Sequence, residues 1–143
     1  MQLCHVESPR HDRFRNRQMG SQKATFQGHS GHMLAGRLDL PQGQWRAAAL
    51  FAHCFTCSKD ILAAKRIANR LCALGLAVFR FDFTGLGHSE GEFSNTDFSS
   101  NVDDLILAAR WMEESGMQPQ MLIGHSLGGA AVLQARGSIP SIQ

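Results

Sequence analysis

One serine of the chain has the surroundings of a nucleophile. Ser126 lies at the centre of Gly124-His-Ser-Leu-Gly128, a G-x-S-x-G pattern. The apolar run 120–124 before it predicts a short buried strand, and the residues after it predict a helix that runs to about Gly137. A serine in a tight turn between a strand and a helix has a strained backbone and a hydroxyl clear of the sheet, so it can attack a carbonyl carbon.

The neighbours of this serine support the same chemistry. Gly124 and Gly128 let nearby backbone pass without a Cβ clash. His125 fills the variable position between the first glycine and the serine. The amide of Leu127 would lie at the N-terminus of the helix, where an unpaired N–H and the helix dipole can stabilise a developing oxyanion.

A carboxylate ends another apolar run. Asp82 closes the predicted strand 77–82 and is followed by a long loop rich in glycine, serine and asparagine. An aspartate that organises this turn, beside Gly85 and Gly87, is favoured over a catalytic carboxylate. The two glycines do not form a dinucleotide-binding loop, because the third glycine of that pattern would fall at Glu90 and no helix follows. We therefore expect no cofactor.

Two of the four cysteines form a C-x-x-C pair. Cys54 and Cys57 could be a redox couple or half of a zinc site, with His53 as a further ligand. A structural zinc site needs four ligands, and the sequence has no second C-x-x-C or H-x3-H pair to complete one. The favoured interpretation is a reduced pair, and we expect no metal.

The elements that position these residues alternate between strands and helices. The helical segment at 61–74 carries a polar side that includes Lys59 and Arg70, with Ser58 as its predicted N-cap and Gly75 as its end. Ser99 or Ser100 is the predicted cap of the next helix. The predicted elements are a hairpin over 23–40 that turns at 28–31, strands at 47–53, 77–82 and 120–124, and helices at 61–74, from 99 or 100 to 114, and from 126. This order requires a mostly parallel sheet with right-handed crossovers.

The composition of the chain predicts two parts, a short basic leader and one folded domain. The 143 residues carry a net charge of +2, too small to imply a nucleic-acid partner. Residues 1–20 are predicted to be a flexible basic leader, although the run Arg10–Arg17 also fits an arm that contacts RNA or lipid. Residues 21–143 are predicted to form a single, partial domain. No apolar run reaches the roughly 20 residues that span a bilayer, and the first twenty lack a signal sequence, so we expect a cytoplasmic protein without membrane contact.

Three spaced motifs resemble the first half of the α/β-hydrolase superfamily. They are His53-Cys-Phe55, Asp82-x-x-Gly-x-Gly-x-Ser89 and the turn at Ser126. The resemblance implies an α/β fold of three layers with an N-terminal β-hairpin, and it implies that the serine turn is a nucleophile elbow. It also implies that Phe55 supplies a second oxyanion amide, with Cys54 as the neighbouring alternative. His53 precedes the nucleophile in the chain, so the resemblance gives it a structural role and not that of the general base.

Two longer stretches resemble a narrower group. His53–Asp60 and Arg80–Phe93 are similar to bacterial hydrolases in which this fold is fused to a C-terminal OsmC-like domain. Compared with the superfamily as a whole, Cys54 stands where many relatives have glycine. Nothing in this chain resembles the OsmC-like domain itself.

The resemblance also implies residues that the chain does not supply. In the superfamily an acid and a histidine follow the serine, and residues 127–143 contain no Asp, Glu or His. We therefore expect a serine hydrolase of small esters, thioesters or amides, truncated after the elbow helix and nearly inactive as 143 residues. The alternative is a non-catalytic interaction module built on the half-fold. In either case the strand at 121–123 is expected to be an exposed edge through which the chain self-associates.

Overall fold

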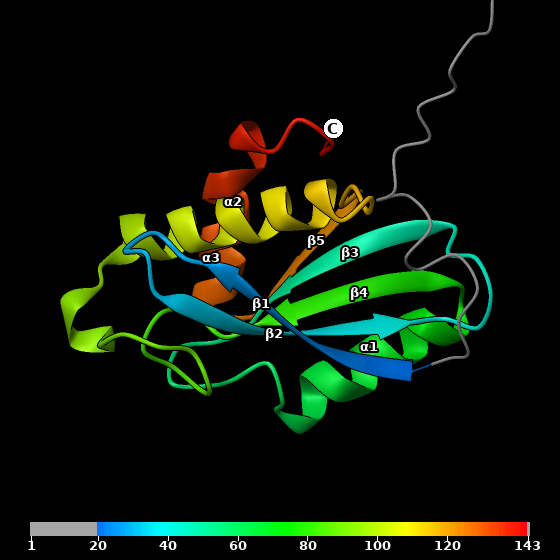
Figure 1. The fold of residues 1–143 in the computed structure, drawn as a ribbon, viewed down its shortest axis with the longest axis horizontal. Coiled ribbons are helices and arrows are strands. Elements are labelled where there is room, and N and C mark those ends of the chain that lie inside the picture. Colours follow the sequence, from blue (N-terminus) through cyan, green and yellow to red (C-terminus); the bar gives the residue numbers. More distant parts are fainter. Residues whose placement is uncertain (1–19, 143) are drawn as a thin grey trace, which may run out of the picture.

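The computed structural model describes residues 20–142, which form one twisted sheet of five strands with helices on both faces (Figure 1). The strand order is β1-β2-β4-β3-β5, which confirms the predicted α/β architecture. In chain order the elements are β1 (Gly20–Gln27), β2 (Met33–Leu40), β3 (Ala47–Ala52), α1 (Leu62–Ala73), β4 (Leu76–Phe81), the 3-10 turn η1 (Phe93–Asn95), α2 (Phe98–Glu114), β5 (Met121–Gly124), α3 (Leu127–Ala135) and the 3-10 turn η2 (Arg136–Ser138). The predicted leader lies outside the described residues, apart from Gly20.

The N-terminal hairpin is confirmed. β1 and β2 pair antiparallel over their whole length, from Gly20 opposite Leu40 to Gln27 opposite Met33. Gly31 adopts a φ of +83° in the turn between them, which glycine tolerates better than other residues do. β2 then pairs antiparallel with β4, so the hairpin turn lies at the same edge of the sheet as the carboxyl end of β4.

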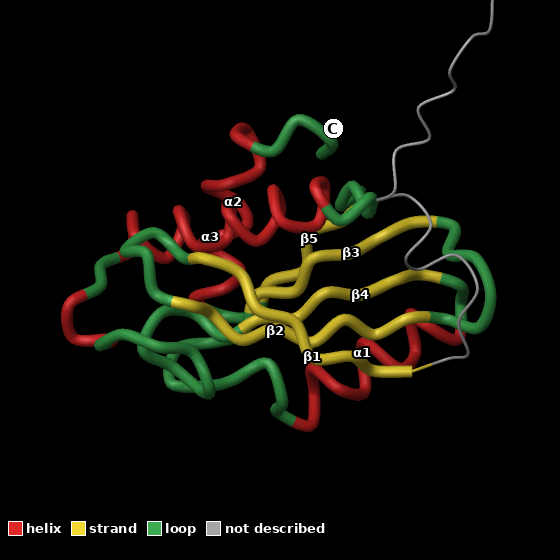
Figure 2. The backbone as a smooth tube through the Cα atoms, viewed as in Figure 1, coloured by secondary structure: helices red, strands yellow, loops and turns green. Residues whose placement is uncertain are grey.

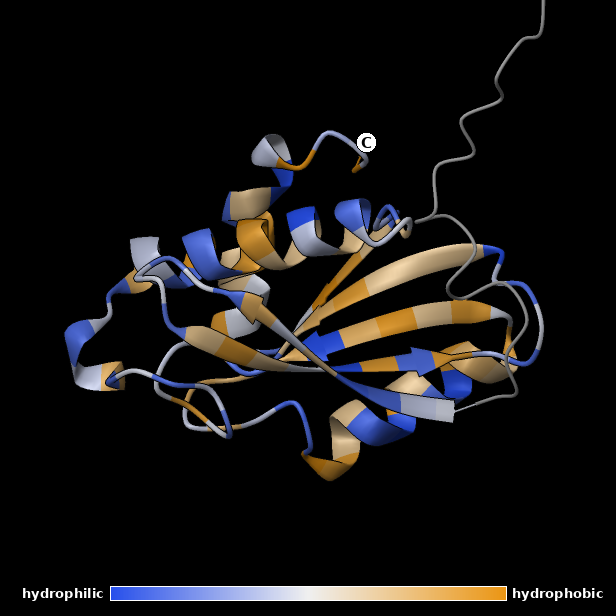
Figure 3. Ribbon diagram, viewed as in Figure 1, coloured by the Kyte–Doolittle hydropathy of each residue, from blue (hydrophilic) through white to orange (hydrophobic). Residues whose placement is uncertain are grey.

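The other strands are parallel, and their carboxyl ends meet at that edge (Figure 2). Helix α1 covers one face of the sheet, and α2 and α3 cover the other (Figure 1). β3 is buried on both faces: Leu50 and Ala52 pack on the α2 side, and Ala49 and Phe51 pack toward α1. Figure 3 shows the resulting apolar colouring along β3 and β5. Continuous apolar runs are typical of strands that helices cover on both sides.

The helix ends differ in part from the predictions. Asp97, not Ser99 or Ser100, is the N-cap of α2: its side chain accepts a hydrogen bond from the Ser100 amide, and the Ser100 hydroxyl in turn accepts one from the Asp97 amide. The predicted Ser58 cap of α1 is wrong, because that helix begins after Ile61 with no side-chain cap. Gly75 does end α1, with a φ of +86°.

The helices of the described region are too short or too polar to cross a membrane. The longest of them, α2, has 17 residues and buries one side against the sheet. A bilayer crossing requires about 20 mostly apolar residues.

The strand that precedes Ser126, β5, is an edge of this sheet. Within residues 20–142, β5 pairs only with β3, and its other side has no neighbouring strand. Its first residue, Met121, is 41% exposed. Unpaired backbone donors and acceptors on an apolar edge strand favour pairing with another chain.

We predict that Met121→Lys reduces self-association of the 143-residue polypeptide, because a charge on an edge strand opposes strand pairing. Sedimentation velocity over a range of concentrations measures the effect. Met33→Lys is the matched control: Met33 is also 41% exposed, but its backbone is bonded to Glu90 and it pairs with Gln27. Equal self-association of the two variants would contradict the edge-pairing prediction.

Candidate active site

Ser126 occupies the sharp turn between β5 and α3. β5 ends at Gly124 and α3 begins at Leu127, so only two residues separate strand from helix. Ser126 adopts φ 55° and ψ −114°, a strained backbone conformation for a residue with a side chain, and it is exposed. Leu127 is the first residue of the helix, so its amide has no acceptor within the helix. The turn thus places the exposed Ser126 directly before the first amide of the helix.

Backbone contacts hold this turn against the end of β3. The His125 amide donates to the Ala52 carbonyl at 3.1 Å. A Cβ on Gly128 would overlap the Ala52 carbonyl and lie 2.6 Å from the His53 oxygen, and a Cβ on Gly124 would overlap the Gly128 backbone. Both glycines are therefore needed for this close approach, which brings the elbow next to the loop that begins at His53.

The loop after β3 begins with a four-residue turn. The Cys57 amide donates to the Cys54 carbonyl at 3.2 Å, and a disulfide joins the same two residues. The expectation of a reduced pair is therefore wrong. Among residues 20–142 no group of three or more His, Cys, Asp or Glu is arranged to hold a metal ion. Phe55, within the turn, is 54% exposed, and its ring lies 5.2 Å from that of Phe93.

His53 is fully buried, and both ring nitrogens have partners. Nδ1 lies 2.7 Å from the Cys54 carbonyl, and Nε2 lies 3.2 Å from the Phe83 amide. A carbonyl can only accept and an amide can only donate, so Nδ1 carries the proton and Nε2 is the acceptor. Burial lowers the pKa of His53 below its ordinary value, which keeps the ring neutral. In this form the ring links the end of β3 to the loop after β4.

Asp82 is buried and anchors the loops around it. Its carboxylate accepts hydrogen bonds from the Lys59 amide at 2.6 Å, from Lys59 Nζ at 2.8 Å and from the His88 amide at 2.9 Å. A Cβ on Gly87 would overlap the carboxylate. Lys59 is 4% exposed, so its placement on the polar side of helix α1 is wrong. The sequence offered no signal for this burial, since a lysine near a helix start is usually solvated.

A second buried ion pair, between Arg80 and Asp39, stabilises the segment before α1. Arg80 Nε donates to Asp39 at 2.7 Å, and Arg80 Nη1 donates to the Lys59 carbonyl. Desolvation acts to raise the pKa of Asp60, but the hydrogen bond from Lys59 and the charges of Lys59, Arg80 and Lys65 lower it overall. The segment between Cys57 and α1 is thus tied to β4 by charged groups.

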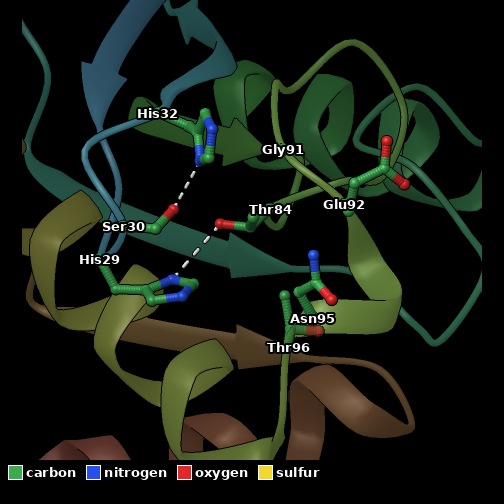
Figure 4. A pocket seen from close by; sticks show the side chains of 8 residues that line it. All are labelled: His29, Ser30, His32, Thr84, Gly91, Glu92, Asn95 and Thr96. Atoms are coloured by element: carbon green, nitrogen blue, oxygen red, sulfur yellow. Dashed lines mark hydrogen bonds between the residues drawn. The ribbon is translucent and has the colours of Figure 1, made fainter.

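A polar pocket of about 450 Å³ lies at the same edge of the sheet, between the hairpin turn and the loop after β4 (Figure 4). His29, Ser30, His32, Thr84, Gly91, Glu92, Asn95 and Thr96 line it. Ser126 does not. Buried Asp104 on α2 accepts hydrogen bonds from the His29 amide, His29 Nδ1, the Thr84 amide and the Thr84 hydroxyl, at 2.7–3.0 Å. Sequence reasoning missed this group, because its members come from three separate elements.

The close approach of Gly128 to the end of β3 can be tested by comparing alanine substitutions at Gly128 and at the adjacent Gly129. We predict that Gly128→Ala lowers the free energy of unfolding by roughly 1–3 kcal/mol, because the new methyl group would overlap the Ala52 carbonyl. Gly129→Ala is the matched control on the same helix: its Cβ would lie 3.5 Å from the nearest atom, an ordinary contact. That variant should be neutral or more stable by up to about 1 kcal/mol. Urea unfolding compares the two, and equal stabilities would contradict the contact.

The neutral state of His53 predicts a dependence of stability on pH. Because its pKa is lowered on folding from 6.5, the unfolded chain binds more protons just below that pH. The free energy of unfolding should therefore fall as the pH drops below 6.5, by at most about 1.4 kcal/mol per pH unit from this group. Urea titrations between about pH 5.5 and about pH 7.5, roughly one unit either side of the ordinary histidine pKa, measure the slope. His53→Gln should reduce this slope, and an unchanged slope in that variant would refute the assignment.

Solved structures of known proteins resemble the chain. The esterase domain of a Rhodothermus marinus protein is 45% identical, with a TM-score of 0.70 over 87% of this chain and 48% of that one. An α/β serine hydrolase without a lid from Xanthomonas campestris is 26% identical, with a TM-score of 0.74 over 87% of this chain and 60% of that one. An α/β-hydrolase from Penicillium sp. sh18 is 25% identical, with a TM-score of 0.77 over 87% and 44%. The chain thus spans about half the length of these relatives.

A family model agrees with the structures. The model described as Serine aminopeptidase, S33, matches residues 43–141, more than half of the chain. This range includes β3, the loop at His53 and the elbow at Ser126. No curated protein matches the sequence with significance. The chain therefore belongs to the α/β-hydrolase superfamily, within the family described as Serine aminopeptidase, S33.

Proposed function

We propose that the chain carries the nucleophile and the oxyanion hole of a serine hydrolase. The observation that carries the proposal is the strained turn at Ser126, with φ 55°, held by backbone contacts beside the loop that begins at His53. A serine in this setting has its hydroxyl exposed and a helix N-terminus at its side. Few structural roles require a non-glycine residue to adopt such a backbone conformation.

The reaction would begin with attack of Ser126 Oγ on an acyl carbon. The amides of Leu127 and Phe55 would donate hydrogen bonds to the oxygen that becomes negative, and water would later release the acid. Cys54 is the neighbouring alternative for the second amide. His53, Gly124, His125, Gly128 and Asp82 are proposed to support the site through their contacts, not to react.

Attack also needs a base for the hydroxyl proton. Residues 127–143 contain no Asp, Glu or His, so the acid and histidine of a complete triad are not in the expected order within these 143 residues. His53 cannot serve, because both of its nitrogens are already bonded. Loss of triad members costs about a million-fold in turnover, so the isolated polypeptide is proposed to be nearly inactive.

The proposed substrate is a small ester, thioester or amide. The Rhodothermus marinus relative is described as an esterase domain, and a Butyrivibrio proteoclasticus relative, Est1E, was solved with ferulic acid bound. In this chain the rings of Phe55 and Phe93 form an apolar surface next to the proposed oxyanion amide, which suits the hydrocarbon part of such a molecule. We propose no cofactor, metal or nucleic acid for the reaction.

We further propose that the chain comes from the group of hydrolases fused to an OsmC-like domain, and that it acts in the cytoplasm. The support is the resemblance of the two motif stretches and the 45% identity to a domain of a larger protein. Sequencing the DNA beyond the codon for Gln143 tests the first part. A reading frame that encodes an aspartate, a histidine and then an OsmC-like domain is the expected result.

The nucleophile can be tested with a fluorophosphonate probe and peptide mapping. We predict slow labelling that is confined to Ser126, because the oxyanion amides would hold the phosphonyl oxygen while the proton has no dedicated base. Ser126→Ala should abolish labelling, and Ser138→Ala, at another exposed serine, should leave it unchanged.

Two other outcomes have distinct meanings. Labelling spread over several serines, or none on Ser126, would favour the non-catalytic interaction module. A rapid burst of ester hydrolysis by the 143-residue polypeptide, lost in Ser126→Ala, would confirm the nucleophile but contradict the proposed inactivity.

A further inference from the structure

Two basic residues, Lys23 and Arg37, face each other across the N-terminal hairpin and are called the hairpin cations below. Lys23 on β1 lies directly opposite Arg37 on β2, and Arg37 lies directly opposite Arg80 on β4. All three side chains are on the α1 face of the sheet, because the residues that alternate with them, such as Leu38 and Phe79, pack in the core on the other face. Like charges directly opposite each other destabilise a pair of strands. This row of three cations therefore needs anions to balance it.

The nearby carboxylates balance only one end of the row. Asp39 binds Arg80 Nε at 2.7 Å. Asp60 lies 3.5 Å from Arg80 Nη1 and 3.0 Å from Lys59 Nζ. Within the part of the chain that the structure describes, neither hairpin cation forms an ion pair. The repulsion between the hairpin cations is thus left uncompensated.

A pocket of about 220 Å³ lies against the hairpin cations, and its polar lining also includes Thr25, Lys59, Asp60 and His88. The charge of Asp60 is already paired, as described above. His88 Nδ1 lies 3.2 Å from Lys59 Nζ, which can only donate, so the neutral ring carries its proton on Nε2. The pocket therefore combines two unpaired cations with two neutral donors, the Thr25 hydroxyl and His88 Nε2.

A phosphate group matches this set of donors. A phosphate monoester carries a charge of about −1.5 to −2 near pH 7 and has three strong acceptor oxygens. Arginine and lysine bind such groups through charge-assisted hydrogen bonds. A carboxylate has a single charge, so it would leave one of the hairpin cations unbalanced. The pocket is smaller than the roughly 300–1,000 Å³ of sites for drug-sized ligands, so the phosphate itself is the group that it can enclose.

We propose that this pocket binds the phosphate group of a small molecule between Lys23 and Arg37, and that the bound phosphate stabilises the two loops that meet at Asp82. The proposal does not depend on the proposed function. Ser126 follows β5, which is three strand intervals from β2, or about 14 Å at the usual strand spacing. The pocket is therefore an effector site, separate from the acyl group that Ser126 would attack.

The two loops contact the pocket through Lys59 and His88. The amides of both residues donate to Asp82, at 2.6 and 2.9 Å, and both side chains line the pocket. A phosphate that accepts a hydrogen bond from His88 Nε2 restrains the ring whose Nδ1 accepts from Lys59. The same phosphate contacts the hairpin cations, so it connects the hairpin to the loops after β3 and β4. A ligand that binds only this folded arrangement stabilises it.

The first experiment measures binding to the 143-residue chain by isothermal titration calorimetry, with inorganic phosphate and with glycerol 3-phosphate at constant ionic strength. Lys23→Gln and Arg37→Gln should each weaken binding at least about tenfold, because each removes a charge-assisted hydrogen bond. Arg110→Gln is the matched control, since it removes the same charge from an exposed residue of α2, on the other face of the sheet. It should leave binding unchanged. Equal binding by Arg37→Gln and Arg110→Gln, or no binding by the unsubstituted chain, would overturn the proposal.

The two ligands also distinguish the source of the phosphate group. Tighter binding of glycerol 3-phosphate would identify an organic phosphate as the ligand, and equal or tighter binding of inorganic phosphate would identify the free ion. Acetate should bind at least about tenfold more weakly than either, because it has one charge and two oxygens. Acetate binding as tight as that of phosphate would refute the assignment to phosphate.

The second experiment uses the opposite effects of Lys23 on stability with and without ligand. In the absence of phosphate, Lys23→Gln should raise the melting temperature, because it removes the repulsion across the hairpin. Lys23→Glu should raise it further, since an ion pair with Arg37 replaces that repulsion. Phosphate should raise the melting temperature of the unsubstituted chain and of Arg110→Gln equally, but not that of Lys23→Glu. A melting temperature lowered by Lys23→Gln, or an unchanged phosphate effect in Lys23→Glu, would contradict the proposal.

The third experiment tests the effect on the loops. Amide hydrogen exchange at Lys59 and His88 should slow at least about threefold when phosphate is bound, while exchange within α2 stays unchanged. Unchanged exchange at both amides with phosphate bound would refute the second half of the proposal. Ser126→Ala should behave as the unsubstituted chain does in all three experiments, so failure of the proposed function and failure of this proposal are distinguishable.

Discussion

The contact between the first turn of α3 and the end of β3 sets the geometry of the whole site. Backbone meets backbone there, because Gly128 has no side chain to separate the helix from the Ala52 and His53 carbonyls. Ser126 follows β5, and the loop at 53–57 follows the neighbouring strand β3, so their separation is fixed by strand spacing and by this one approach. The two segments are therefore locked to each other by backbone contact.

Polar groups buried beneath the loops connect the segments that this backbone contact does not reach. His53, Asp82, Lys59 and Arg80 are all nearly inaccessible, and hydrogen bonds between them and the backbone connect β3, β4 and the segment before α1. Removing one member of such a network leaves its partner buried without compensation, which costs more than the net contribution of the bond itself. The carboxyl edge of the sheet is therefore held by buried polar contacts at His53, Lys59 and Asp82. The turn at 54–57, which these side chains do not span, is closed by the disulfide.

Local patterns predicted the framework well, for a physical reason. The apolar runs that became β3, β4 and β5 and the helical spacing of α1 are properties of adjacent residues, and so is the glycine pair around Ser126. Features that depend on the folded arrangement were not predictable. Lys59 meets Asp82 across 23 residues, and nothing near Lys59 in the sequence distinguishes it from a solvated lysine. The Asp97 cap was missed because three polar residues within four positions offered similar caps. The pairing of Cys54 with Cys57 depends on the turn between them, which the spacing alone does not determine.

The carboxylate of Asp104 has a consequence for the order of folding. It joins His29 across 75 residues and Thr84 across 20, and all four of its hydrogen bonds need α2 to be docked on the sheet. The hairpin and β4 can pair earlier, since strand pairing does not involve the helix. The turn at 28–31 and the start of the loop after β4 gain their common anchor only when that helix docks, so we expect the walls of the pocket in Figure 4 to be among the last parts of the described chain to become ordered.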